Sequence, residues 1–330
     1  MKLGKSVIAE LLISLLMIAA LFYFANIGDV LRVIEGIEFK WLALAFVFYF
    51  GINLCMALRI WAILRDLTVG ISYPKTLMAH FTGMLASDFT PARSGYLTTA
   101  FVLSRNNKIP LEKTMVSILG PQIFDFFLKV TAGAIAFWYL LTYVLHVNAE
   151  ESILFAVIFG IFALSTMIAV MFLSLFSPRF LKMMSFIKRL PFGKAVHELV
   201  ENIQQNSHTI RRLFWFILLL LGFTWLLKAL EWYCIALAVG FTPDVPFAPI
   251  IFFAFLQPLV TILQFAPLPT FAGVGFSEAA SVFVLMQFGV APAPALVFSL
   301  LTRFVMIAVD SIGIREAVKM LRLDGSKAKQ

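Results

Sequence analysis

Long apolar runs separated by short polar segments dominate the chain. Six of these runs are long enough to cross a bilayer, at about 6–26, 41–64, 114–145, 151–177, 213–241 and 292–314. A transmembrane helix needs about 20 consecutive apolar residues, so we expect each run to be a full span. The pattern predicts an all-α polytopic membrane protein.

Two further apolar stretches, 75–105 and 247–289, are broken in the middle. The first contains DFTPARSG around Pro91 and the second contains PLPTFAGVGFSE around Pro269. Backbone that leaves a helix inside hydrocarbon must find polar partners in protein or in a water-filled cavity. We therefore interpret each stretch as a broken helical hairpin, either re-entrant or fully spanning, and the two breaks as candidates for a functional site.

Loop charge gives an orientation. Segments 27–40 and 146–151 lack an excess of Lys and Arg and are expected outside, whereas 178–212 is strongly basic and is expected in the cytoplasm. With both termini cytoplasmic in a cell-membrane protein, the two hairpins enter from opposite faces, in a pseudo-inverted arrangement. We expect one transmembrane domain over 1–330, in which 178–212 is either an amphipathic surface segment or a plain basic loop.

Composition agrees with this interpretation. The chain is 61% hydrophobic and 13% charged, too apolar for a soluble globule of 330 residues. We attribute its net charge of +8 to basic cytoplasmic loops and expect no nucleic-acid partner. Cys55 and Cys234 lie inside apolar runs and predict no disulfide. P-loop, zinc and nucleophile-elbow motifs are missing from the sequence, so we expect no cofactor, no metal and no enzyme activity.

Several charged residues inside the apolar runs have a structural interpretation. Asp125 and Lys129 are spaced i, i+4, and Lys228 and Glu231 i, i+3, so each pair can neutralise itself on one helix.

Three other polar residues also have a structural interpretation. Arg59 and Asp310 lie toward helix ends, where we expect them to reach the interface, and we expect His80 to be a satisfied buried histidine.

Four charged residues at or near the breaks are harder to explain this way: Asp88, Arg93, Glu278 and Arg303. Helices that restart after Gly95 and Gly273 would direct free N–H groups at the breaks and, with Arg93, would favour a phosphate. The alternative is structural, with Asp88 paired to Arg93 and Glu278 paired to Arg303 across helices.

These motifs resemble a flippase-like transmembrane family that includes the membrane portion of lysylphosphatidylglycerol synthases. The resemblance is carried by TPARSG, LSRNNKIP, Phe124-Asp125, APLPTFAGVGFSEAA and the run that ends at Arg303. The family's Pro-x-x-x-Gly-x-Gly-x-x-Glu pattern and downstream Arg fall on Pro269, Gly273, Gly275, Glu278 and Arg303. In the first motif Arg93, Gly95 and Asp125 fit, and Tyr96 stands where the family usually has an acidic residue.

The resemblance implies translocation of a lipid between leaflets. Larger members continue into a soluble aminoacyltransferase domain, but this chain resembles the membrane part alone. Our leading hypothesis is a passive or ion-coupled flippase for a lipid with an anionic, phosphate-containing headgroup, and a separate lipid-modifying enzyme is one candidate partner. An integral-membrane transferase and a non-transporting assembly protein are the alternatives. The expected substrate-binding residues are Arg93, Glu278, Arg303, Asp88, Gly95, Gly273, Gly275 and Asp125.

Overall fold

The computed structural model describes residues 5–144, 193–263 and 273–319, with scattered positions between 162 and 185. Within these residues the chain forms helices and no strand. The prediction of an all-α polytopic membrane protein is confirmed.

Five of the six predicted spans correspond to helices. They are α1 (Lys5–Ala25), α3 (Phe39–Asp66), α6 (Leu111–Tyr139, continued by the π-turn η2, Leu140–Val144), α11 (Phe214–Val239) and α14 (Pro292–Asp310, followed by the 3-10 turn η5, Ser311–Gly313). At 1.5 Å per residue, the 28 residues of α3 extend about 42 Å, more than a hydrocarbon core of about 30 Å requires. Most of the sixth span, 151–177, lies outside the described residues.

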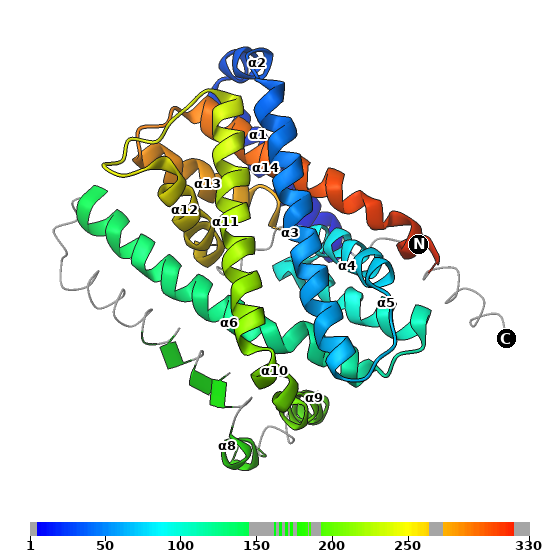
Figure 1. Ribbon diagram of the computed structural model, residues 1–330. Coiled ribbons are helices and arrows are strands. Elements are labelled where there is room, and N and C mark those ends of the chain that lie inside the picture. The colour runs from blue at the N-terminus through cyan, green and yellow to red at the C-terminus, as the bar shows by residue number, and fades with distance from the viewer. Residues whose placement is uncertain are drawn as a thin grey trace.

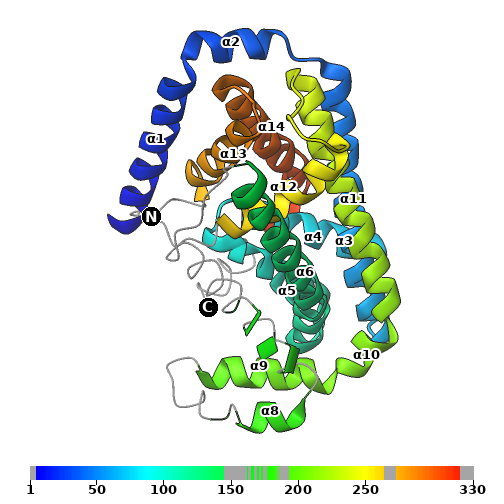
Figure 2. The same ribbon diagram turned by 90° about the vertical axis from the view of Figure 1, so that its left-hand side faces the viewer.

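Helices α3 and α11 lie side by side, across the middle of the view in Figure 1 and along one edge of the molecule in Figure 2. Their close approach uses Gly51, where an added Cβ would lie 3.4 Å from Leu227 of α11. The main core gathers around this pair and includes Tyr49, Trp232 and Phe253. In hydrocarbon, close packing of this kind replaces the hydrophobic effect as the force between helices.

The segment 27–40, expected as a loop, instead contains helix α2 (Ile27–Glu35). The chain turns by 82° between α1 and α2, and the Asn26 side chain accepts a hydrogen bond from the Gly28 N–H at 3.1 Å. Val30 is buried, while Asp29 and Arg32 form an exposed ion pair at 2.8 Å. This two-sided pattern makes α2 a surface helix, which lies across the top of the molecule (Figure 2).

Both broken stretches fold as pairs of short helices. The first consists of α4 (Tyr73–Asp88), the 3-10 turn η1 (Pro91–Leu97) and α5 (Thr98–Asn107). The second consists of α12 (Pro249–Leu263) and α13 (Phe276–Gln287), and the break at Pro269 lies outside the described residues.

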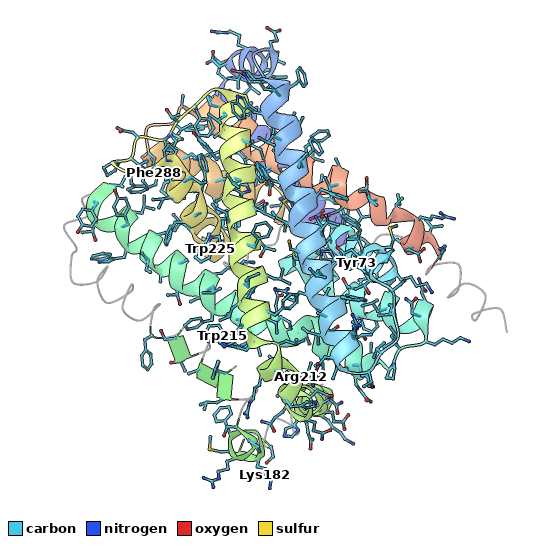
Figure 3. All side chains as sticks on the ribbon, viewed as in Figure 1. Tyr73, Lys182, Arg212, Trp215, Trp225 and Phe288 are labelled. Carbon is cyan, nitrogen blue, oxygen red and sulfur yellow. The ribbon has the colours of Figure 1, made fainter. Side chains whose placement is uncertain are left out.

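The basic segment 178–212 is largely helical, with α8 (Pro178–Met183), α9 (Gly193–Gln205) and α10 (Ser207–Arg212). Lys182 and Arg212 lie together at one end of the molecule (Figure 3), opposite the end that carries α2. An ion pair between Arg212 and Asp66 attaches α10 to the end of α3. The two segments that loop charge assigned to opposite faces therefore lie at opposite ends.

Candidate functional site

The second break ends in a tight turn that begins α13. Gly273 and Gly275 have φ values of +72° and +86°, a region that L side chains rarely adopt. Gly275 also packs against α1, because an added Cβ would lie 2.7 Å from Met17 Cβ and 3.1 Å from the Ser14 carbonyl oxygen. The backbone conformation therefore favours glycine at both positions, and at Gly275 the close approach of α1 also leaves no room for a side chain.

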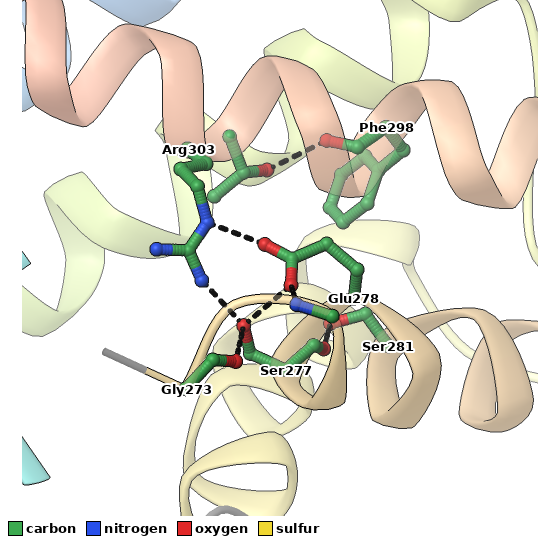
Figure 4. A network of polar contacts seen from close by, with 8 residues as sticks. Gly273, Ser277, Glu278, Ser281, Phe298 and Arg303 are labelled. Atoms are coloured by element: carbon green, nitrogen blue, oxygen red, sulfur yellow. Dashed lines mark hydrogen bonds and ion pairs between the residues drawn. The ribbon is translucent and has the colours of Figure 1, made fainter. Parts of the chain in front are cut away.

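A buried polar network follows the turn (Figure 4). Glu278, only 2% exposed, pairs through Oε1 with the Nε of Arg303 on α14. Its other oxygen, Oε2, accepts the Gly275 N–H at 2.7 Å. The cross-helix pairing of Glu278 with Arg303, one half of the structural alternative from the sequence, is therefore present.

Ser277 links the two charged groups and was missed at the sequence level. Its hydroxyl accepts a hydrogen bond from Arg303 Nη2 at 2.6 Å, and it lies 2.9 Å from Glu278 Oε2 and 3.0 Å from the Gly273 carbonyl. A hydroxyl has one proton, so Ser277 donates to only one of these two acceptors at a time. Its position between the Gly275 turn and Glu278 is the feature of the sequence that could have identified it.

The network differs in one respect from the expected anion site. We expected free N–H groups at a helix restarting after Gly273, but α13 begins at Phe276 and its own Glu278 satisfies the Gly275 N–H. An N-terminal carboxylate of this kind offsets the positive end of the helix dipole. Arg303 retains 22% side-chain exposure, so the open part of the network is cationic.

The hydroxyl of Thr90 bridges the first break. The Gly95 N–H donates to Thr90 Oγ1 at 2.7 Å, and Thr90 Oγ1 in turn donates to the Ala86 carbonyl at 3.0 Å. A Cβ on Gly95 would overlap the Ala86 carbonyl, so only glycine fits. We expected the helix to restart directly after Gly95. It restarts at Thr98 instead, because the 3-10 turn η1 intervenes.

Of the two charged residues at this break, the structure describes the side chain of Asp88 only. Asp88 is buried, 5% exposed, at the end of α4. The side chain of Arg93 lies outside the described residues, so its predicted role stays a prediction.

The two local ion pairs predicted from spacing are present. Lys129 Nζ lies 2.8 Å from Asp125 Oδ2, and Lys228 Nζ lies 2.9 Å from Glu231 Oε2. Glu231 has no exposed surface, and Lys228 also lies 5.1 Å from the ring centre of Tyr49. Asp125 therefore has a structural partner within its own helix.

Two expectations about single residues were wrong, and a third was confirmed only in part. Arg59 does not reach the interface but is 3% exposed, and Asp310 is fully buried and accepts the Tyr49 hydroxyl at 2.7 Å. His80 is fully buried, yet neither ring nitrogen has a hydrogen-bond partner among the described residues. Distance from a helix end did not reveal how deeply these side chains are buried in the protein, because neighbouring helices cover them from the side.

An apolar cavity of about 190 Å³ lies between α6 and α12. It is lined by Ile135, Ala136, Tyr139, Phe247, Ile251, Phe252, Phe255, Leu256, Leu259 and Phe288. Since α12 is the first arm of the second hairpin and Phe288 directly follows its second arm, this cavity flanks the broken element. Across the described ranges, no three His, Cys, Asp or Glu side chains converge as a metal site would require.

The long apolar helices, two broken hairpins and a buried carboxylate–guanidinium network define a multi-pass helical membrane protein with a polar site at a helix break. The family model described as the lysylphosphatidylglycerol synthase TM region matches residues 7–313, and the chain belongs to this family. The resemblance stated from the motifs is thereby confirmed.

One curated relative is described as a UPF0104 membrane protein, from Methanothermobacter thermautotrophicus. It is 29% identical over 123 residues, which cover 37% of this chain and 35% of the relative. The match therefore spans about a third of that relative's length.

Proposed function

We propose that this protein moves a lipid with an anionic, phosphate-containing headgroup between the leaflets of a cell membrane. The observation that carries the proposal is the Glu278–Arg303–Ser277 network at the second break. Ionisable residues within a bilayer are costly, and those that line a polar pathway are the usual exception. The partly exposed Arg303 guanidinium can meet a phosphate, and the buried Glu278 holds that guanidinium in place until the phosphate arrives.

The apolar cavity beside α12 supports the same proposal, because it suits the acyl chain of a lipid rather than its headgroup. Its walls are aliphatic and aromatic, as an acyl chain requires, and it flanks the hairpin that carries the polar network. A lipid would place its headgroup in the polar site and its chain against apolar surface. We therefore propose a passage along the second hairpin. Its expected counterpart consists of Asp88, Arg93 and Gly95 of the first hairpin and Asp125 of α6.

The orientation and the absence of enzyme activity belong to this proposal. Arg179, Lys182, Lys194, Arg211 and Arg212 all belong to α8–α10, at the end opposite α2. A Lys/Arg excess is typical of the cytoplasmic side, so we place α8–α10 and both termini in the cytoplasm. A separate enzyme would then supply or modify the lipid, and transport would be passive or ion-coupled.

The test is leaflet exchange of headgroup-labelled lipids in liposomes, read with a membrane-impermeant quencher. We expect Glu278→Gln to abolish exchange while the protein stays folded. Glu231→Gln is the matched control, since it neutralises an equally buried carboxylate that lies on α11, a helix outside both hairpins. Equal loss of exchange in both variants, with both proteins still folded, would refute a specific role for the second break. No exchange by the wild type with any lipid would favour a transferase, detectable by mass spectrometry of a lipid product.

A further inference from the structure

We infer that a second anion-binding site, selective for a phosphate group, lies between α3 and the first hairpin, with Arg59 as its centre. Arg59 is 3% exposed, and it forms no ion pair with any described residue. An arginine keeps its positive charge when it is buried, whereas a lysine can lose its proton. A buried cation without a counter-charge is costly, so an anion is required.

The neighbours of Arg59 offer hydrogen-bond donors rather than carboxylates. His80 of α4 and Tyr96 of η1 interact electrostatically with the guanidinium, and the neutral Tyr96 hydroxyl also interacts with it as a hydrogen-bond partner. The two rings meet edge-on, with their centres 5.8 Å apart. His80 has two unused ring nitrogens among the described residues, one of which is a donor in the neutral ring.

Thr99 of α5 adds a hydroxyl to the same place. Gly83 lies one turn after His80 on the same face of α4, and it packs directly against Thr99, whose Oγ1 is buried without a partner in the described part of the chain. Four elements, α3, α4, η1 and α5, therefore bring polar groups to one buried place. Buried polar atoms left unpaired in this way indicate a ligand or ordered water.

Nearby acidic residues do not replace the missing anion. Asp125 interacts electrostatically with Tyr96, but its carboxylate is held by Lys129 at 2.8 Å. Asp88 lies eight residues beyond His80 on α4, a rise of about 12 Å. A planar guanidinium with surrounding N–H and O–H donors suits a tetrahedral phosphate, which it can bind with two parallel hydrogen bonds.

The phosphate can come from a lipid headgroup or from free inorganic phosphate. The assignment of this phosphate to a lipid rests on the proposed function. The inference that the site binds a phosphate group does not depend on that function. Arg59 lies seven residues before the end of α3, about 10 Å along the helix, a depth that a headgroup can reach.

The test is thermal unfolding of the detergent-purified protein, followed by tryptophan fluorescence, with increasing dioctanoyl phosphatidic acid, inorganic phosphate or dioctanoylglycerol. We expect phosphatidic acid to raise the Tm and dioctanoylglycerol, which lacks phosphate, to leave it unchanged. Arg59→Met should weaken the apparent affinity by about 10- to 150-fold. Arg65→Gln is the control, because Arg65 is an exposed cation on the same helix and should keep the shift.

Without ligand, Arg59→Met should melt no lower than the wild type, because it removes an unpaired buried charge and keeps a helix-forming side chain of similar length. A clearly lower Tm would show a structural partner for Arg59 and overturn the inference. An unchanged affinity in Arg59→Met, or no shift with either phosphate ligand, would also overturn it.

The ligand arms identify the source of the phosphate. A shift with phosphatidic acid alone assigns the site to a lipid, and a shift with inorganic phosphate as well assigns it to the phosphate group itself. An Arg59-dependent shift in a protein that exchanges no lipid would retain this site and refute only the proposed function.

Discussion

Substitution of Gly275 by alanine tests whether α1 fixes the turn before Glu278. The new Cβ would have to occupy φ +86° and would lie 2.7 Å from Met17 Cβ. A left-handed conformation costs an L residue about 1–2 kcal/mol, and overpacking costs about 1–3 kcal/mol more. We expect Gly275→Ala to lower the free energy of unfolding by about 2–5 kcal/mol.

The matched control is Gly240→Ala at the end of α11. Gly240 has a similar φ of +82°, but an added Cβ would meet nothing within 4 Å among the described residues. It should therefore show only the conformational cost of about 1–2 kcal/mol. Unfolding by SDS in mixed micelles, followed by circular dichroism, gives both values under the same conditions.

A second substitution separates the contact from general disruption. Met17→Ala keeps the Cβ that the new methyl group would meet, so it should not rescue Gly275→Ala. Equal destabilisation of Gly275→Ala and Gly240→Ala, or rescue by Met17→Ala, would refute the packing of α1 on this turn.

Four further substitutions have expected outcomes in the same unfolding assay. Glu231→Gln should destabilise by about 3–5 kcal/mol, because it removes the buried ion pair with Lys228, whereas Arg32→Gln in an exposed pair should cost less than about 1 kcal/mol. Similar losses of stability in the two variants would contradict the role of burial. Tyr49→Phe should cost about 1.5–3 kcal/mol by removing a hydrogen bond to buried Asp310, and a neutral effect would contradict that bond. Gly95→Ala should cost at least about 1–3 kcal/mol through overlap with the Ala86 carbonyl, which wild-type stability would disprove.

The features that local sequence determines were predicted correctly. Apolar length alone located α3, α11 and the other described spans, because the bilayer imposes length on a helix. The spacing of Asp125 with Lys129 was enough to predict their ion pair, since residues four apart lie on the same helix face.

The features that lateral packing determines were not predicted. Arg59 is near enough to a helix end to reach the interface, but the first hairpin covers it. Helix α2 was missed because only nine residues follow the turn at Asn26, too few for a hydropathy window. Ser277 gave no charge signal, although it bridges Glu278 and Arg303.

The two breaks differ in how their charge is balanced, and this difference bears on the proposed transport. At the second break, an anion that approaches Arg303 must displace a carboxylate already held on it. At the first hairpin, an anion that approaches Arg59 competes with no ion pair from the described residues. A phosphate should therefore bind readily beside Arg59, whereas at the second break Glu278 must first hold Arg303 in position and then yield it to the phosphate. Glu278→Gln removes the first of these steps, so it should abolish exchange without weakening phosphate binding beside Arg59.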